Sequence, residues 1–301
     1  MEGWILYKYA ENESEQNPYW RRRFFEAAQK LNIDLKILDP EQIDLVVTRD
    51  DRKSVYVDQK AVPLPDFVLP RMGYKTTYFS LAIIRHLERL GVPCINTSES
   101  IETVKDKLYS QQILAQKHIP VPKTMLMKFP LDVDLIETNI KFPIVIKTLS
   151  GGEGKGVFLA ENKKKFQDLM ELIEVTNPNF NIIVQEYIES SHGRDLRVFV
   201  IGGKVVACMQ RSASENEFRA NVSIGGSTKQ YPISTEVEYL ATQAASIFEL
   251  DIAGVDLLFD KDHFKICEVN SSPGFQGVEN CIDVKIPERI FEFIKFRYGM
   301  V

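Results

Sequence analysis

The amino-acid sequence predicts an α/β protein, with a parallel sheet in its first third and strand-rich α+β structure after it. Three observations predict this fold class. Strand and helix patterns alternate from Trp4 to Leu90, an order typical of a parallel sheet with helices on its faces. A β-rich run that ends at Lys147 leads into a glycine-rich loop and a second strand. The last third is dense in short apolar strands.

The first third carries three strand patterns and two helix patterns. The helix after the first strand is predicted because Trp20, Phe24 and Leu31 recur at helical spacing. No G-x-G-x-x-G follows the first strand, which disfavours a dinucleotide-binding domain. The predicted strands are 4–9, 35–38 and 67–70, and the predicted helices are 18–31 and 76–90.

The rest of the chain continues with one long helix and then a series of strands. The helix is predicted over 98–117, since the prolines at 120 and 122 prevent its continuation. Later helices are predicted over 161–174 and 235–250 and from Pro287 onward. The strands are predicted at 142–147, 157–160, 182–185, 196–201, 205–210, 254–259 and 264–269.

Composition excludes several classes of protein. The 301 residues are 44% hydrophobic and 26% charged, which is ordinary for a globular protein and unlike a disordered, collagen-like or coiled-coil chain. A net charge of −5 argues against a general nucleic-acid binder. No apolar run reaches the ~18 residues of a membrane span, and no signal pattern opens the chain, so we expect a cytoplasmic protein that does not bind membranes. None of the four cysteines forms a C-x-x-C pair, which leaves zinc and redox sites unsupported.

The strongest local signal is a predicted hairpin, 254–259 and 264–269, joined by a short polar turn. Glu268 and Asn270 are two residues apart and therefore share one face, and Asp256 can meet them across the hairpin. Two carboxylates and an amide oxygen suit Mg²⁺, which completes its shell with water and phosphate. The alternative is a pair of solvated carboxylates, but charge embedded in apolar strands is costly without a partner.

A second signal is Lys147 at the end of a strand, followed by the glycine-rich loop 150–156. The loop is not a P-loop, because Gly156 follows Lys155 where Ser or Thr would be needed. With a strand on each side, its tip could close over phosphates as a flap, using backbone N–H groups. A flexible surface hairpin is the alternative.

Two weaker signals follow. The strand ending at Gln185 enters an acid-rich loop whose backbone could pair with an adenine edge, with Asp195 accepting ribose hydroxyls, although an ordinary strand and turn fits equally well. Arg197 and Arg211 lie on adjacent predicted strands, and Arg219 follows with Asn221. Their guanidinium forks match carboxylate and phosphate groups.

Taken together, these motifs resemble those of the ATP-grasp superfamily, and within it the RimK-type α-L-glutamate ligases. The resemblance extends from about Arg71 to the C-terminus and is weaker before it. It is carried by Asp106-Lys107, the run to Lys147, Gln185-Glu186-Tyr187-Ile188, Asp195-x-Arg197, Phe218-Arg219-Ala220-Asn221, Gly254-Val255-Asp256 and Glu268-Val269-Asn270-Ser271-Ser272-Pro273-Gly274.

The resemblance implies a three-part fold in which two α+β subdomains clamp ATP. It implies a pre-ATP-grasp parallel-sheet domain at 1–96, a central subdomain with the glycine-rich flap at 97–185 and a C-terminal subdomain with the metal site at 186–301. The implied Mg²⁺ ligands, for two ions with Mn²⁺ as a substitute, are Asp256, Glu268 and Asn270. The implied ATP-binding residues are Lys107, Lys147, Gly152, Gly154, Gly156, Glu186, Tyr187, Ile188, Asp195, Arg219 and Asn221.

The implied reaction is ATP-dependent carboxylate–amine ligation. The γ-phosphate passes to a carboxylate, an amine attacks the acyl phosphate, and an amide forms. We expect Arg211 to stabilise the developing charge, together with Arg197, and no residue stands out as a general base. Alternatives are a ligase that cyclises a peptide through its side chains, a non-catalytic ATP-binding module and a kinase.

L-Glutamate is the expected amine donor, on the resemblance and on the arginines near Arg219, which could hold a carboxylate bidentately. Arg71 follows a predicted parallel strand, where α/β proteins bind ligands. We therefore expect Arg71 to contact the acceptor, although it could instead form a surface salt bridge, and we expect further substrate contacts from Arg219 and Asn221. The loop after Asn221 is neutral where many relatives carry a basic residue, so the acceptor stays open among a protein C-terminus, a peptide and a small molecule. Relatives often form dimers or tetramers, which leaves a homo-oligomer open.

Overall fold

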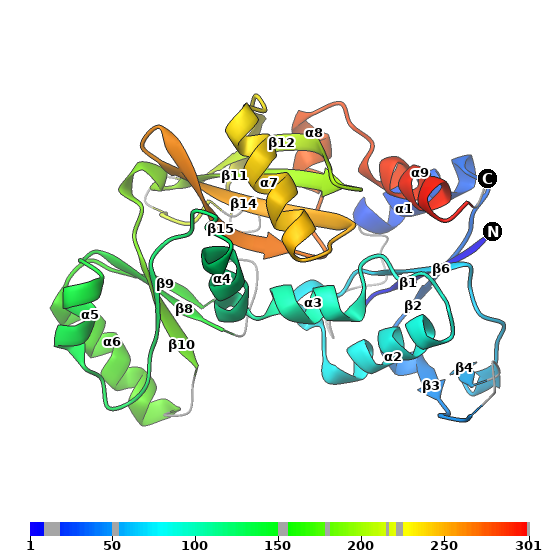
Figure 1. Cartoon of the computed structure of the whole chain (residues 1–301), viewed down its shortest axis with the longest axis horizontal. Coiled ribbons are helices and arrows are strands. Elements are labelled where there is room, and N and C mark those ends of the chain that lie inside the picture. Colours follow the sequence, from blue (N-terminus) through cyan, green and yellow to red (C-terminus); the bar gives the residue numbers. More distant parts are fainter. Residues whose placement is uncertain are drawn as a thin grey trace.

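The computed structural model describes residues 1–8, 19–49, 54–149, 156–177, 181–214, 217–220 and 225–299. Within this part the strands form four sheets. Figure 1 shows them in three groups, with the elements of residues 124–186 forming a separate lobe at the left. The two chain ends lie together at the opposite end of the molecule (Figure 1).

The N-terminal sheet is parallel, which confirms the α/β prediction. β1 (Glu2–Leu6) lies between β2 (Asp34–Leu38) and β6 (Phe67–Pro70). Alternate residues of β1 face opposite sides, so Ile5 packs with α1 (Tyr19–Lys30) and Trp4 packs with α2 (Tyr78–Arg89). Gly3 is needed in β1 because a Cβ there would lie 2.2 Å from the ring of Phe67.

A small antiparallel sheet beside it escaped prediction. It is formed by β3 (Ile43–Leu45), β4 (Val55–Val57) and β5 (Lys60–Ala61). Strands of two or three residues are too short to display a period-2 pattern. Single 3₁₀ turns occur at η1 (Pro40–Gln42), η2 (Gly73–Lys75) and η3 (Glu189–Ser191).

The single helix predicted over 98–117 is wrong. The chain forms α3 (Ser98–Lys105) and α4 (Lys107–Gln116), with Asp106 between them in an extended conformation. The Asp106 carboxylate accepts hydrogen bonds from the backbone N–H groups of Leu108 and Tyr109, at 2.9 and 3.0 Å. Because Asp is a favoured N-cap, it begins a new helix rather than continuing the old one.

The central lobe is an antiparallel sheet in the order β7-β10-β8-β9. Its strands are β7 (Thr124–Leu126), β8 (Ile144–Thr148), β9 (Val157–Ala160) and β10 (Ile182–Glu186), and its helices are α5 (Val133–Asn139) and α6 (Lys163–Thr176). Phe166 and Met170 of α6 pack on Ile146 and Val184 of the sheet, so this lobe has its own core.

The largest sheet is antiparallel in the order β13-β12-β11-β14-β15. Its strands are β11 (Arg194–Ile201), β12 (Lys204–Ser212), β13 (Ser227–Gln230), β14 (Ile252–Asp260) and β15 (His263–Asn270). β14 and β15 form the predicted hairpin. The remaining helices are α7 (Thr235–Ile247), α8 (Gln276–Cys281) and α9 (Ile286–Arg297).

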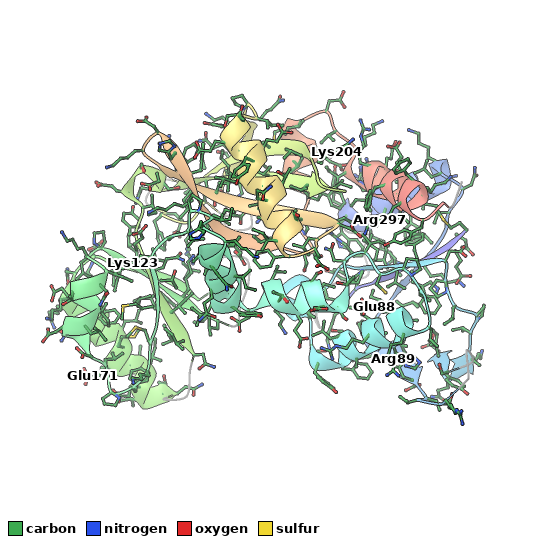
Figure 2. The ribbon with its side chains drawn as sticks, viewed as in Figure 1. Glu88, Arg89, Lys123, Glu171, Lys204 and Arg297 are labelled. Atoms are coloured by element: carbon green, nitrogen blue, oxygen red, sulfur yellow. The ribbon has the colours of Figure 1, made fainter. Side chains whose placement is uncertain are left out.

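One hydrophobic core joins this sheet to the N-terminal sheet. α7 packs on one face, where Ala241 contacts the cluster around Val198 and Val255. The other face contributes Phe199 and Ile252 to the cluster that also holds Ile5 and Phe67, together with residues of α1 and α9. Arg297 of α9, labelled in Figure 2, adds an ion pair with Asp251 at 2.8 Å. The described helices include none with both the length and the hydropathy of a membrane span.

Candidate active site

The middle of the largest sheet carries a buried network of two carboxylates and two guanidiniums. The strand register places Asp195 opposite Arg211 and Arg197 opposite Asp256. Arg211 donates two hydrogen bonds of 2.7 Å to Asp195, and Arg197 donates two to Asp256. Arg211 also lies 2.9 Å from Asp256, so the two pairs share one carboxylate. The sheet therefore brings together four of the predicted site residues, paired as bidentate forks.

Burial and pairing have opposite effects on these groups. Burial alone would raise the pKa of Asp256, but Arg197 and Arg211 outweigh it and hold that pKa below its ordinary value. At Asp195, burial raises the pKa, the nearby Asp256 adds to the rise, and Arg211 opposes it. For Arg211 itself, burial would lower the pKa, yet the two carboxylates raise it. Arg211 therefore stays charged, and both guanidiniums are held in fixed positions in a buried site, which is where electrostatic stabilisation is strongest.

The predicted metal residues lie on one side of the hairpin. Asp256 is directly opposite Glu268, and Asn270 is opposite Gly254, two residues further along β15. The Glu268 side chain has no hydrogen bond or ion pair with any other described residue. The centre therefore holds three carboxylates, with Glu268, and two guanidiniums. Its net negative charge favours the binding of a cation.

The donor chemistry fits a hard divalent ion. In the part of the chain that the structure describes, no three His, Cys, Asp or Glu side chains cluster as a metal site. The set of Asp256, Glu268 and Asn270 therefore supplies two carboxylates and one amide, and it needs water or phosphate oxygens to complete an octahedral shell. That is the usual arrangement for Mg²⁺.

Lys147 is held by a chain of hydrogen bonds across the central sheet. Its Nζ donates to Gln185 Oε1 at 2.7 Å and to the Cys267 sulfur at 3.3 Å. The Gln185 amide nitrogen donates to Thr124 Oγ1 at 2.9 Å, and that hydroxyl donates to the carbonyl of Pro122. Gln185 is only 2% exposed. The Lys147 ammonium group, on β8, is thus hydrogen-bonded both to the neighbouring strand β10 and to β15 of the other sheet.

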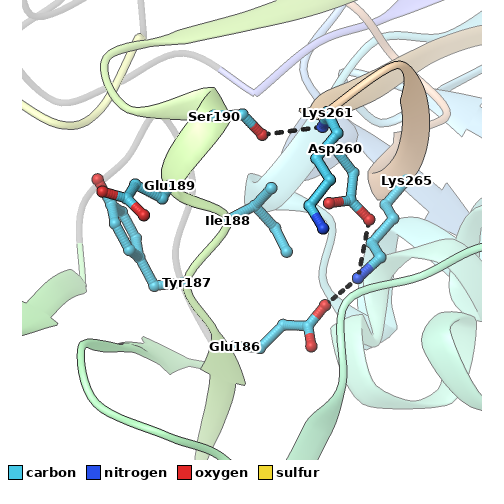
Figure 3. Close-up of a pocket in the computed structure, with 8 residues that line it drawn as sticks. All are labelled: Glu186, Tyr187, Ile188, Glu189, Ser190, Asp260, Lys261 and Lys265. Atoms are coloured by element: carbon cyan, nitrogen blue, oxygen red, sulfur yellow. Dashed lines mark hydrogen bonds and ion pairs between the residues drawn. The ribbon is translucent and has the colours of Figure 1, made fainter.

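A pocket of about 450 Å³ lies where the chain passes from β10 to β11, within the usual range for ligand pockets. Figure 3 shows Ile188 pointing toward Lys265, whereas Tyr187 lies on the far side of the backbone. Lys265 pairs with Glu186, and with Asp260 at 3.3 Å. The pocket is lined by Glu186, Tyr187, Ile188, Glu189, Ser190, Asp260, Lys261 and Lys265. Three of the predicted ATP-binding residues therefore share one pocket.

The glycine-rich loop begins and ends on paired strands. β8 and β9 are antiparallel neighbours, and Thr148 N donates to the Gly156 carbonyl at 3.0 Å. Gly156 has a φ of +75°, and a Cβ there would lie 2.3 Å from Thr148 Oγ1. Glycine is therefore required at that end of the loop. The predicted residues Gly152 and Gly154 lie outside the described residues.

The remaining predicted residues are placed around this centre. Lys107 is the first residue of α4, directly after the Asp106 cap. Arg219 donates to Glu217 through two side-chain nitrogens, at 3.0 and 2.7 Å, and Asn221 lies outside the described residues. Arg71 is buried, and its Nη2 donates to the Pro273 carbonyl at 2.9 Å, so the surface salt bridge considered from the sequence is absent among the described residues.

Sequence reasoning missed three residues of the site. No site role is predicted from the sequence for Gln185, Cys267 or Lys265. The available signal was period 2, which places Lys265 and Cys267 on one face of their strand. The contact of Lys147 with Cys267 spans 120 residues of sequence, so no local pattern reveals it.

Comparison with protein families agrees with this geometry. The family model for the RimK-like ATP-grasp domain matches residues 104–294, and the model for the RimK PreATP-grasp domain matches residues 13–101. The chain belongs to the RimK-like ATP-grasp family. Members of this family similar to the chain include a probable alpha-L-glutamate ligase of Vibrio atlanticus, 37% identical over 281 residues that cover 93% of this chain and 92% of that protein.

A second such relative is a probable alpha-L-glutamate ligase of Rhodopirellula baltica, 39% identical over 279 residues, which cover 92% of this chain and 68% of that protein. Among solved structures, the ATP-grasp ligase PsnB with a precursor variant, Mg and ADP aligns with a TM-score of 0.74 at 19% identity, over 97% of both chains. The D-alanine–D-alanine ligase of Bacillus anthracis with ATP aligns with a TM-score of 0.70 at 16% identity, over 100% of this chain and 98% of the other. The fold is that of an ATP-grasp protein, and this RimK-like chain is an ATP-dependent ligase.

Proposed function

We propose that the chain joins the amino group of L-glutamate to a carboxylate of a peptide, a protein C-terminus or a small molecule, through an acyl phosphate. The observation that carries this proposal is the buried network in which Arg211 and Arg197 converge on Asp256, beside Glu268 and Asn270. It combines fixed positive charge with oxygen ligands at one place. Phosphoryl transfer to a carboxylate needs both, since the reaction is governed by positioning and charge stabilisation.

In this proposal the nucleotide lies between the central lobe and the largest sheet. Adenine rests against the segment Glu186–Ile188, in the pocket described above. Lys147, held by Gln185 and Cys267, contacts the nucleotide from the lobe side. Lys107 at the start of α4 supplies a second ammonium, and the loop ending at Gly156 closes over the phosphates. Asp195 as a ribose acceptor also stays a prediction, with its two oxygens accepting from Arg211.

Asp256, Glu268 and Asn270 would hold Mg²⁺, with two ions and Mn²⁺ substitution as further predictions. The ion supplies neutralisation of phosphate charge. Arg211 orients the acceptor carboxylate and stabilises the charge that develops on the acyl phosphate. Arg197 keeps Asp256 ionised and in place. The amine of the donor then attacks the acyl carbon, phosphate leaves, and the amine proton passes to solvent.

The test is ADP release over a panel that crosses amino acids with carboxylate acceptors. We expect release only when ATP, Mg²⁺, L-glutamate and an acceptor with a free carboxylate are all present, with a product heavier by one glutamyl unit per ATP. Stimulation by lysine or ornithine, and not by glutamate, would refute the donor and keep the ligase. A stable phosphoester without an amide would refute the ligation step.

A further inference from the structure

Arg71 is a buried cation with no carboxylate partner among the described residues. It follows β6 directly, is 9% exposed, and stacks near two aromatic rings, with its Cζ 5.7 Å from the Phe24 centroid and 5.8 Å from the Phe275 centroid. Its Nη2 donates to Pro273 O, but Nη1 is buried and has no hydrogen-bond partner. Burial lowers the pKa of Arg71 to about 10. Burying an uncompensated charge is costly, so the charge of Arg71 does not stabilise the fold.

A second unsatisfied donor belongs to the same aromatic cluster. The indole nitrogen of Trp20 is buried and has no hydrogen-bond partner. The Trp20 ring lies 4.3 Å from the Tyr7 ring and 6.4 Å from the ring of Phe24, the residue that also contacts Arg71. A buried N–H left unsatisfied costs the full desolvation penalty of that group. Arg71 and Trp20 thus each carry an unsatisfied donor near the Phe24 ring, and a group that accepts hydrogen bonds would satisfy them.

The position of these donors links them to the catalytic centre. Tyr7 and Arg71 follow the paired parallel strands β1 and β6, at the C-terminal edge where α/β sheets bind ligands. Pro273, the partner of Arg71, is three residues after Asn270 on the chain and packs against β14. It can do so because residue 254 is glycine: a Cβ there would lie 2.5 Å from Pro273. The buried guanidinium thus contacts the segment that leaves the proposed metal site.

We propose that Arg71 and Trp20 bind a carboxylate of the amino-acid donor, one that the reaction does not consume. The inference rests on the proposed function and adds the site of the donor to it. The acceptor carboxylate must reach the phosphate and the metal ligands, whereas a carboxylate held by a buried guanidinium stays unreacted. Holding the donor by its carboxylate orients its amine, which converts the second step into an intramolecular one.

Binding can be measured without turnover, through Trp20 itself. The chain has two tryptophans, and Trp4 is buried with its indole nitrogen bonded to Glu2. In Trp4→Phe, the emission of Trp20 should change saturably with glutarate and stay constant with glutaramide, which has the same length and no carboxylate. Arg71→Gln should abolish the change. The matched control is Arg85→Gln, whose guanidinium is paired with Glu102 at 2.7 Å, and it should behave like the parent.

Kinetics separate this site from the proposed function. Arg71→Gln should raise KM for L-glutamate by ~10- to 100-fold, the loss of a charged hydrogen bond, and leave KM for ATP and for the acceptor within twofold. Trp20→Phe, which removes only the N–H, should raise the same KM by a smaller factor. If the parent enzyme makes no glutamyl product, the proposed function fails, whatever the emission titration gives. If it makes the product and Arg71→Gln leaves KM for L-glutamate unchanged, or raises KM for the acceptor instead, the donor site is refuted.

Thermal unfolding tests whether Arg71 has only a structural role. Because Arg71 is a buried charge without a counter-ion, Arg71→Met should unfold at the same temperature as the parent or higher. A large fall in the unfolding temperature, together with parallel changes in every KM, would show that Arg71 serves packing and would overturn the proposal.

Discussion

Arg197 and Asp256 lie directly opposite one another on β11 and β14, and both carboxylate oxygens accept hydrogen bonds from the one guanidinium. Arg211 reaches the same carboxylate at 2.9 Å. Asp256 is therefore both a proposed metal ligand and the shared anion of a buried network. The stability of the sheet and the proposed metal binding therefore both depend on Asp256. Variants of its partners are needed to separate the two roles.

Arg197→Met should lower the free energy of unfolding by about 3–5 kcal/mol, because it leaves the buried Asp256 carboxylate with one cation fewer. Arg85→Met is the control. It breaks an exposed pair with Glu102, so its loss should stay within about 1 kcal/mol. Denaturant titration measures both. Equal losses would mean that the buried network contributes no more than a surface ion pair.

Glu268→Gln should reduce turnover by ~10²-fold or more, because charge neutralisation by a bound metal is worth several kcal/mol. Its unfolding curve should match the parent, since no described side chain pairs with Glu268. Asp262→Asn, on the exposed turn of the same hairpin, is the control for general loss of charge. Normal Mg²⁺ dependence of turnover in Glu268→Gln would remove this residue from the metal site.

Gln185→Met should raise KM for ATP by ~10-fold, because Lys147 loses the acceptor that holds it at 2.7 Å. Thr124→Val should give a smaller rise, since it removes only the hydroxyl that fixes the Gln185 amide. Steady-state kinetics should show kcat less affected than KM. Gln42→Met, near the small N-terminal sheet, is the control and should change neither kcat nor KM for ATP. An unchanged KM for ATP in Gln185→Met would contradict the role of this chain of hydrogen bonds.

Asp106→Ala should cost about 1 kcal/mol of stability, the usual value of an N-cap. It should also raise KM for ATP, because the cap fixes the first turn of α4 and with it Lys107. Asp132→Ala removes the equivalent cap of α5 and should cost similar stability without a change in KM. If both variants shift KM alike, the position of Lys107 does not depend on its cap.

Gly156→Ala should destabilise the chain more than Gly203→Ala. Both glycines have positive φ, +75° and +73°, so both alanine variants carry ~1–2 kcal/mol of backbone strain. Only at Gly156 would the new methyl group meet Thr148, at 2.3 Å, whereas nothing lies within 4 Å at Gly203. Thermal unfolding gives the comparison. The double variant Gly156→Ala with Thr148→Ala should recover part of the difference, and failure to recover it would reject the contact.

The existence of the hairpin could be predicted from sequence because its two strands and its turn are local patterns. The turn sets the pairs nearest to it, such as Asp260 with His263, but the register shifts by one residue between Asp256 and Leu257, and this shift places Asp256 opposite Glu268. The break at Asp106 is also local, because the capping bonds of one carboxylate begin a second helix there, but the sequence pattern predicts a single helix over 98–117.

The rest of the site depends on contacts between distant segments. Arg197 and Asp256 are 59 residues apart, and the register that joins them is set by the packing of the whole sheet rather than by either strand. From sequence, Arg197 and Arg211 could be predicted as side chains that match carboxylate or phosphate, and Asp256 as a metal ligand, and these roles stay predictions. Their pairing into one network, and the unsatisfied nitrogens of Arg71 and Trp20, become visible only when the sheets are assembled.

The transfer of oxygen from the acceptor to phosphate tests the central claim most directly. Peptides labelled with ¹⁸O in their carboxylates are incubated with the enzyme, ATP, Mg²⁺ and L-glutamate, and the peptide and the released phosphate are both analysed by mass spectrometry. We predict a peptide that gains a glutamyl unit and one ¹⁸O atom in the phosphate for each amide formed. A glutamyl peptide with unlabelled phosphate, or a phosphorylated peptide that keeps all its label, would contradict ligation through an acyl phosphate.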